Sequence, residues 1–346
     1  MSGAENAGVR EGRPGPLGAT PPGTRDVLPD EMRELRAISD SLRATFERAD
    51  YGEVWTPLVE YEDVLVRGDQ GAADGGYRLF DEHGRVLVLR SDMTIPIARV
   101  VASQLRDVRP PIRLSYHAHS YRAVERGRGQ SREFLQVGIE LVGASEPDGD
   151  AEVIALVLEA LAEAGLRRHR VGVGDGSLYR TVLSDLEVSE REREPLMEAL
   201  ARRDMVRVEE RVAQLGLSRS AHDLLTAIPA LRGGPSVLER GDGPVARAAE
   251  NLRTCHALLA DRGAAERTIF DLGLVRELGY YTGIVFELYD PAVGFAIGGG
   301  GRYDELLGRF GRPLPACGAA LDLERVHMAA TAEERLDRGG GARGSR

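Results

Sequence analysis

Residues 132–142 read Arg-Glu-Phe-Leu-Gln-Val-Gly-Ile-Glu-Leu-Val. Successive side chains of a β-strand point to opposite faces, and a strand over this stretch sorts its residues into two kinds. One face is aliphatic and consists of Leu135, Val137, Ile139 and Leu141. The other carries Gln136 and Glu140 on either side of Gly138. The first face predicts packing against a core, and the second predicts a polar floor with room over the glycine for a bound group.

A second predicted strand precedes this one and ends at Tyr121-Arg122. The residues between the two strands, Glu125 to Gln130, are rich in glycine and arginine and predict a turn. The pair therefore reads as strand, basic loop, strand. An ordinary hairpin with a solvated polar face has the same pattern, so this segment alone leaves both interpretations open.

Composition limits the class of protein. The chain has 346 residues, of which 42% are hydrophobic and 29% charged, enough for one large domain or two smaller ones. No apolar run is long enough to span a membrane, and the N-terminus lacks a signal-peptide pattern, so a cytoplasmic location is expected. Cys255 and Cys317 are too few for a disulfide framework or a thiolate zinc site, and we expect free thiols.

The chain contains no lysine, and all 45 of its basic residues are arginine. We attribute this to mutational bias toward arginine codons in the source genome, and the chemical consequence holds whatever the cause. A Walker-type phosphate loop, a Schiff-base lysine and a pyridoxal-phosphate anchor each need a lysine and are excluded. The net charge of −10 argues against nucleic acid as a partner. His117 and His119 share a strand face but have no third ligand at suitable spacing, so we expect no metal and no cofactor.

The order of predicted elements favours an α+β fold. A helix with an apolar stripe follows Pro29, short strands follow to Val142, and Asp150 is expected to cap a helix that Gly165 ends. Residues 177–266 are charged and strongly helical, which predicts a helical insertion within a body spanning residues 21–330. Strands then resume before a turn over Gly298 to Gly301 and a final helix after Gly318. Hairpin-like strands on both sides of the insertion indicate an antiparallel sheet flanked by helices. Residues 1–20 and 331–346 are predicted to be disordered.

The hairpin of residues 121–142 resembles motif 2 of the class II aminoacyl-tRNA synthetases, and is most similar to the histidyl type. Further segments resemble histidyl motifs in the same order along the chain. They are Leu89 to Thr94, Leu274 to Gly283, Gly299 to Asp304 and Gly318 to Arg325. The resemblance covers roughly residues 20–330, and it implies a class II synthetase-like fold.

The resemblance also implies a histidine pocket. Taken singly, Arg276 would more often be an ion-paired surface residue, and Tyr281 and Tyr303 would more often be packing residues. Taken together, the matching positions carry carboxylates for an ammonium group, arginines for a carboxylate and polar side chains around an imidazole. The candidate histidine-binding residues are Asp92, Thr94, Arg122, Gln136, Glu140, Arg276, Tyr281 and Tyr303.

The departures from the synthetase pattern fall where ATP would bind. The motif 2 glutamate that contacts adenine is replaced by Val124, and Gln130 stands where the loop offers an arginine. In the segment resembling motif 3, whose arginine corresponds to Arg325, a glycine is replaced by Asp322. These changes predict that adenylation has been lost.

After Arg325 only 21 residues follow, whereas a histidyl-tRNA synthetase continues into an anticodon-binding domain. A synthetase-like body with these features resembles the family of ATP phosphoribosyltransferase regulatory subunits. The resemblance implies a non-catalytic homodimer that pairs with a short-form catalytic subunit and senses histidine. A truncated histidyl-tRNA synthetase-like enzyme, or a freestanding histidine-binding or ligase module, stays open as an alternative.

Overall fold

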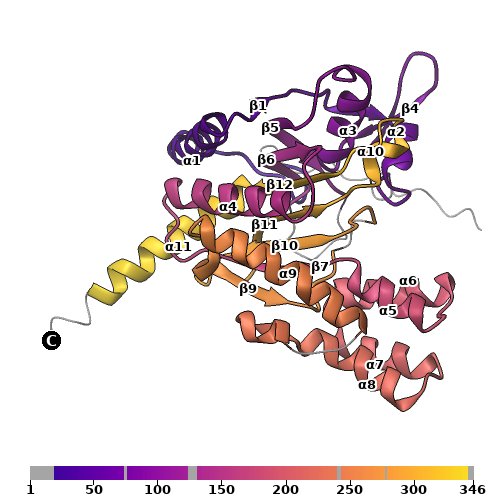
Figure 1. Cartoon of the computed structure of the whole chain (residues 1–346). Coiled ribbons are helices and arrows are strands. Elements are labelled where there is room, and N and C mark those ends of the chain that lie inside the picture. The colour runs from indigo at the N-terminus through magenta and orange to yellow at the C-terminus, as the bar shows by residue number, and fades with distance from the viewer. Residues whose placement is uncertain (1–18, 74–75, 124–130, 240–242, 277–278, 342–346) are drawn as a thin grey trace, which may run out of the picture.

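The computed structural model describes residues 19–73, 76–123, 131–239, 243–276 and 279–341. Its centre is a nine-stranded sheet with the order β1-β5-β6-β12-β11-β10-β7-β9-β8 (Figure 1). The strands are β1 Gly52–Glu53, β5 Ile112–Tyr121, β6 Glu133–Val142, β7 Arg170–Asp175, β8 Arg232–Gly233, β9 Thr268–Asp271, β10 Ile284–Tyr289, β11 Ala296–Arg302 and β12 Ala316–Asp322. Neighbouring strands are antiparallel except in the pairs β1–β5 and β7–β9. The predicted α+β architecture is confirmed.

Long helices cover one face of the sheet. They are α1 Pro29–Arg48, α4 Asp148–Glu163, α9 Gly243–Asp261 and α11 Leu323–Gly341. The predicted aliphatic face of β6 is confirmed, because Val137, Ile139 and Leu141 are buried in the core beneath these helices. The apolar stripe of α1 lies in the same core, and Leu42 is fully buried there.

The other face carries smaller elements and a second core. A three-stranded sheet of order β2-β4-β3 packs there with three helices. Their bounds are β2 Val59–Tyr61, α2 Glu62–Gly68, β3 Arg78–Phe80, β4 Val86–Leu89, α3 Thr94–Ser103 and α10 Leu306–Arg309. Gly138 faces this side, but the expected open space above it is filled by Tyr116. A Cβ at position 138 would lie 2.4 Å from the Tyr116 hydroxyl oxygen and 2.3 Å from the Ala319 carbonyl oxygen.

The helical residues between β7 and β9 form two groups. Helices α5 Leu178–Asp185, α6 Glu190–Ala201, α7 Met205–Gln214 and α8 Arg219–Ala227 lie beyond the β9 end of the sheet (Figure 1). Buried Asp271 holds them there by accepting a hydrogen bond from Arg203 Nη2 at 2.9 Å. Helix α9, in contrast, packs against α4 behind the sheet, and β8 pairs with β9. The stretch 177–266 therefore contains both an outlying helical group and elements of the body.

Two local predictions were wrong because contacts distant in sequence override local pattern. Asp150 does not cap α4; it lies inside the first turn, where it is buried against Arg302. Gly298 to Gly301 form no turn but belong to strand β11. Gly318 lies in β12, and the helix predicted after it begins at Leu323. The glycines permit close strand packing, since a Cβ on Gly300 would lie 2.0 Å from the Gly318 carbonyl oxygen.

The predicted disorder of residues 331–346 is also wrong as far as Gly341, where α11 ends. The buried Glu333 carboxylate accepts hydrogen bonds from the backbone N–H groups of Arg167 and Arg168, at 2.9 and 2.8 Å. Asp337 adds an ion pair to Arg168 at 2.7 Å. These contacts fix the helix to the loop before β7, which local sequence does not reveal. Residues 1–18 and 342–346 lie outside the described residues.

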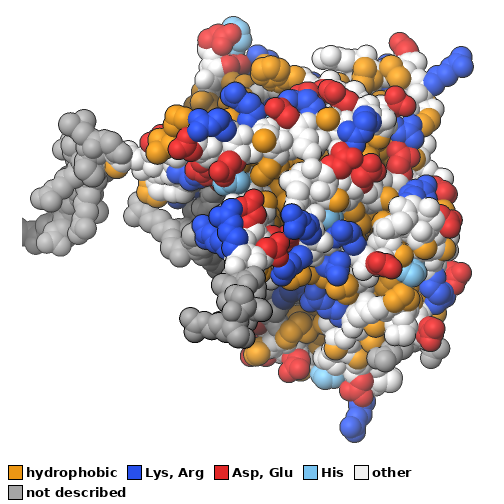
Figure 2. Space-filling view, turned by 90° about the vertical axis from the view of Figure 1, so that its left-hand side faces the viewer, with side chains coloured by type: hydrophobic (Ala, Val, Ile, Leu, Met, Phe, Trp, Pro, Cys, Tyr) orange, Lys and Arg blue, Asp and Glu red, His pale blue; other side chains and the backbone are white. Residues whose placement is uncertain are grey.

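Both cysteines are free and buried, Cys255 on α9 and Cys317 on β12. Within the described ranges, every helix is too short or too polar to cross a membrane. On the face drawn in Figure 2, arginine and acidic side chains lie interspersed.

Candidate functional site

Glu140 is the centre of the candidate pocket. It points from β6 to the side opposite the long helices, and its side chain is buried. Thr94 Oγ1, at the start of α3, donates a hydrogen bond to Glu140 Oε1 at 2.9 Å, and the Tyr303 hydroxyl donates to Oε2. Burial raises the pKa of Glu140 to about 8 despite these two hydrogen bonds. Gly318 on the neighbouring strand leaves room for the carboxylate, because a Cβ there would lie 1.7 Å from Oε2.

A second buried carboxylate, Asp92, lies near Glu140. Its Oδ1 accepts a hydrogen bond from the Ile95 backbone N–H at 3.3 Å. Burial raises the pKa of Asp92, while the positive charge of Arg122 opposes this effect. The negative charge of Asp92 in turn raises the pKa of Glu140. Two carboxylates that share a buried site favour a bound cation, because a positive charge would allow both to ionise.

Buried tyrosine rings pack around Glu140. The ring centroids of Tyr280 and Tyr281 are 5.1 Å apart, and those of Tyr280 and Tyr303 are 5.8 Å apart in an edge-to-face arrangement. Tyr116 lies beneath them, opposite Gly138 in the β5–β6 register. Sequence reasoning missed Tyr116 and Tyr280. Strand alternation could have found Tyr116, since it shares a face of β5 with Ala118 and Ser120.

Arg276 lies at one side of these rings. Its Nη1 donates to the Phe286 carbonyl oxygen at 3.3 Å, and its guanidinium carbon is 6.0 Å from the centroid of the Tyr281 ring. Gly299 makes space for it, because a Cβ at that position would lie 2.1 Å from Nη1. The arginine therefore reaches the pocket across β10 and β11.

The remaining predicted residues lie farther along β5 and β6. Gln136 Oε1 accepts a hydrogen bond from Ser120 Oγ at 2.9 Å, and both side chains are buried. The Arg122 guanidinium lies over the Phe134 ring, 4.9 Å from its centroid. The structure thus brings Asp92, Thr94, Glu140, Tyr281 and Tyr303 together, with Arg276 beside Tyr281. Arg122 and Gln136 line the same sheet face, and the positive charge of Arg122 acts on Asp92.

The residues expected at the ATP side engage one another. Arg325 Nε lies 3.2 Å from Asp322 Oδ2, and Arg325 Nη1 donates to the Ala296 carbonyl oxygen at 2.8 Å. Asp322 also accepts a hydrogen bond from the backbone N–H of Arg325 at 3.1 Å, which is the geometry of a helix N-cap. A phosphate would have to compete with this carboxylate for Arg325. Val124 and Gln130 lie outside the described residues.

His117 has protein partners in place of a metal. Its Nδ1 lies 2.8 Å from Ser39 Oγ and 3.0 Å from Arg43 Nη2. Among the described residues there is no group of three or more histidine, cysteine, aspartate or glutamate side chains that could hold a metal ion.

A family model described as histidyl-tRNA synthetase matches residues 23–326. The chain resembles solved structures throughout the same region. One, from Bacillus halodurans C, is entitled an ATP phosphoribosyltransferase regulatory subunit/histidyl-tRNA synthetase. It is 35% identical with a TM-score of 0.82, over 91% of this chain and 83% of that one. The fold is therefore that of the histidyl-tRNA synthetase class.

Curated relatives give a narrower assignment. A protein of Rubrobacter xylanophilus named ATP phosphoribosyltransferase regulatory subunit is 44% identical over 323 residues, which cover 89% of this chain and 76% of that protein. One of Desulforamulus reducens with the same name is 38% identical over 318 residues, covering 90% and 79%. The chain belongs to the family of ATP phosphoribosyltransferase regulatory subunits.

Proposed function

We propose that the chain is a non-catalytic regulatory subunit of ATP phosphoribosyltransferase, acting in histidine biosynthesis, and that it binds L-histidine in the pocket around Glu140. Family membership supports the role as a subunit. The chemistry of the pocket supports the ligand, because histidine is a zwitterion with an imidazole ring. Its ammonium would lie between Asp92 and Glu140, its carboxylate on Arg276, and its ring among the tyrosines.

The observation that carries this proposal is the contrast between the two sides of the site. The amino-acid side keeps two buried carboxylates and the packed tyrosine rings. On the nucleotide side, the arginine assigned to the phosphates is paired with a carboxylate of its own chain. In a chain without lysine, phosphate binding depends on arginine, metal or backbone N–H groups, so a carboxylate at this position opposes ATP.

Two measurements test the proposal together. Calorimetry with L-histidine is expected to show binding, and L-histidinol, which keeps the ammonium and lacks the carboxylate, is expected to bind more weakly. Exchange of labelled pyrophosphate into ATP in the presence of histidine is expected to stay at background. Exchange above background would contradict the non-catalytic role, and lack of histidine binding would contradict the ligand.

A short-form catalytic ATP phosphoribosyltransferase chain is the proposed partner, and the cytoplasm is the proposed location. A histidine site without chemistry becomes useful when its occupancy is coupled to another active site. Such coupling amounts to about 1–3 kcal/mol in typical allosteric proteins and is reciprocal for binding. Feedback by histidine would then follow if the ligand binds the assembled and free states unequally.

We also propose that the chain forms a homodimer. The apolar stripe of α1 is not available for this contact, because Leu35 and Leu42 are buried inside the molecule. Large apolar side chains are exposed instead on and beside the three-stranded sheet, where Trp55 is 92% and Phe80 73% exposed. We call this surface the small-sheet patch. It consists of Trp55, Leu58, Val59, Tyr61, Leu79 and Phe80, and a group of exposed large apolar side chains favours a protein interface.

One observation favours a histidyl-tRNA synthetase-like activity as the second candidate. A structure from Alicyclobacillus acidocaldarius entitled a histidine–tRNA ligase subunit is 34% identical with a TM-score of 0.76, over 92% of this chain and 98% of that one. The pyrophosphate exchange measurement separates this activity from the regulatory role. A freestanding histidine-binding or ligase module would be supported if histidine binds but no catalytic chain associates.

A further inference from the structure

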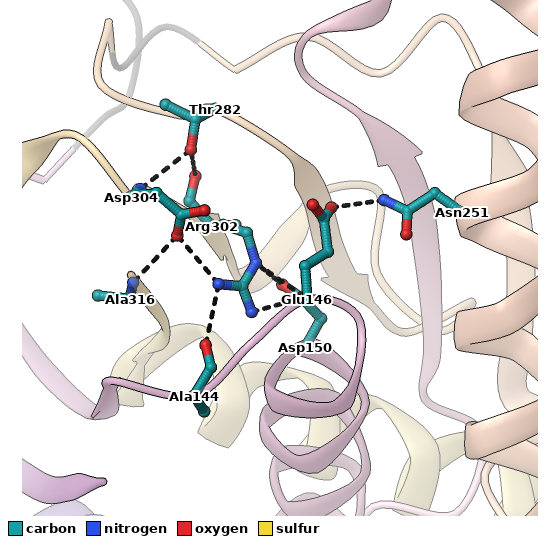
Figure 3. Close-up of polar contacts among 8 residues, drawn as sticks. All are labelled: Ala144, Glu146, Asp150, Asn251, Thr282, Arg302, Asp304 and Ala316. Atoms are coloured by element: carbon teal, nitrogen blue, oxygen red, sulfur yellow. Dashed lines mark hydrogen bonds and ion pairs between the residues drawn. The ribbon is translucent and has the colours of Figure 1, made fainter. Parts of the chain in front are cut away.

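A buried arginine lies directly behind the pocket and contacts none of the candidate ligand-binding side chains. Arg302 is fully buried, and its Nε and Nη2 lie 2.9 and 2.8 Å from Asp150 Oδ2. Its Nη1 donates to Asp304 Oδ1 at 2.9 Å and to the Ala144 carbonyl oxygen at 3.2 Å (Figure 3). Asp150, Arg302 and Asp304 are called the arginine array below.

Tyr303 is the residue between two members of this array. Its backbone N–H donates to the Ala316 carbonyl oxygen at 2.7 Å, and the Ala316 N–H donates to Asp304 Oδ1 at 3.1 Å. The Asp304 N–H donates to Thr282 Oγ1 at 3.0 Å, and the Thr282 N–H donates to the Arg302 carbonyl oxygen at 2.8 Å. Hydrogen bonds thus hold the peptide groups on both sides of Tyr303, and the Tyr303 hydroxyl donates to Glu140.

A gain in folding stability does not by itself explain why a charged arginine is buried here. A buried ion pair loses hydration free energy that its attraction only partly returns, and well-packed apolar side chains often serve as well or better. Here a charged residue is placed where it fixes the backbone of a pocket tyrosine. Residues that support a ligand-binding side chain without touching the ligand can hold that side chain in the geometry that binding needs.

We propose that the arginine array is a positioning device that holds the Tyr303 hydroxyl on Glu140 and thereby sets the ionisation of Glu140 and the affinity of the pocket. This inference takes only the identity of the ligand, L-histidine, from the proposed function. Glu140 is faced by ionisable groups from several elements, and Tyr303 is the one the array positions. The others are Asp92 before α3, Tyr116 on β5, and Tyr280 and Tyr281 before β10.

The test measures the titration of Glu140 in the free chain by NMR with carboxyl-labelled glutamate. Tyr303→Phe removes a donated hydrogen bond and is expected to raise the midpoint. Asp304→Asn weakens the hold of Arg302 while keeping an acceptor for the Ala316 N–H, and it is expected to raise the midpoint in the same direction. In the double variant, Asp304→Asn should add nothing to Tyr303→Phe, because its effect passes through the Tyr303 hydroxyl.

Histidine affinity, measured in parallel, is expected to fall about tenfold in Asp304→Asn and not to fall further in the Tyr303→Phe background. Asp150→Asn is a second array variant with the same expectation. If it does not fold, Asp304→Asn still decides the question, because the Asp304 side chain is 39% exposed and tolerates change better. Asn251→Ala is the matched control. Asn251 donates to Glu146 beside the array but contacts none of its members, so neither the midpoint nor the affinity should change (Figure 3).

An unchanged Glu140 midpoint in Asp304→Asn, or additive effects in the double variant, would overturn the inference. Shifted midpoints in a chain that binds no histidine would support the array and contradict only the proposed ligand. The two failures are therefore distinguishable.

Discussion

Glu140 and Arg276 are the residues on which the proposed histidine binding depends most. The alternation of β6 and the ordered motifs selected the candidate site residues, and most of these residues lie close together in the structure. What the sequence could not reveal is the protein environment of each group. Burial of Glu140 depends on Tyr303, which is 163 residues away in the chain, and on Gly318, which strand pairing places opposite Glu140.

Replacing Arg276 with alanine is expected to weaken histidine binding while leaving the fold intact. The ligand carboxylate would lose its charged partner at a partly buried position, at a cost of roughly 2–4 kcal/mol. Calorimetry measures the difference. Arg219→Ala, at a 95% exposed side chain on α8, serves as the control and should bind like the wild type. Equal affinities of the Arg276→Ala variant and the wild type would place the ligand elsewhere.

Glu140 is expected to make stability depend on pH. Its pKa is about 8 in the folded protein against 4.5 for an unperturbed glutamate, so the folded state holds a proton that the unfolded state has lost between these values. The free energy of unfolding should therefore fall as pH rises through this window, by at most about 1.4 kcal/mol per pH unit. Glu140→Gln removes this contribution, and the variant should gain stability over the wild type mainly near pH 8 and above.

Denaturant unfolding at several pH values from 4.5 to 9 checks this expectation. Histidine affinity of the wild type should change over the same pH range, but in the opposite direction. The ammonium favours ionised Glu140, so affinity should rise with pH up to about 8. Parallel pH profiles of stability in the wild type and Glu140→Gln would mean that Glu140 is ionised throughout.

At the scale of elements, periodic patterns predicted β6 and α1 correctly, and errors came where distant contacts overrule local preference. Asp150 has the pattern of a helix cap, but its partner Arg302 is 152 residues away. The glycines of β11 have the pattern of a turn, yet they are there because neighbouring strands approach too closely for a Cβ. The end of α11 looks too polar and too rich in glycine to fold alone, and it is held by backbone donors before β7.

The small-sheet patch is expected to mediate self-association. Both outer strands of the small sheet, β2 and β3, have an edge without a partner strand in the described chain, and their exposed apolar side chains favour pairing with another molecule. Phe80→Asp should convert a dimer into monomers, as measured by light scattering. Val206→Asp, which also replaces an exposed apolar residue, lies on α7 and should leave the dimer intact. A dimer that persists in Phe80→Asp would locate the interface on another face.

The fold class of the whole molecule could be predicted because several motifs occur in the same order as in the family. Such agreement constrains the topology more than any single element does. The number of strands, the two parallel pairs and the separation of α9 from the outlying helices were not predictable. Each depends on which distant segments pair, and neither residue preference nor periodicity encodes that choice locally.

Mixing the chain with a short-form catalytic subunit is expected to give a mixed oligomer and to raise phosphoribosyltransferase turnover. The rise should respond to histidine, and Arg276→Ala should shift the response to higher histidine concentration. Light scattering and an assay of the phosphoribosyl product measure both effects. A catalytic chain that is fully active and equally sensitive to histidine when alone would contradict the regulatory role.

The two buried thiols can serve as internal clocks, because their rates of chemical modification measure local opening. A thiol reagent modifies a buried cysteine only during transient local opening, so the rate of modification reports how often each region opens. Cys317 lies on β12, beside the strand that carries Glu140, and Cys255 lies on α9 behind the sheet. A ligand that tightens the pocket alone would slow the Cys317 clock and leave the Cys255 clock unchanged. One that slowed both would show that α9 and the pocket open as a single cooperative unit.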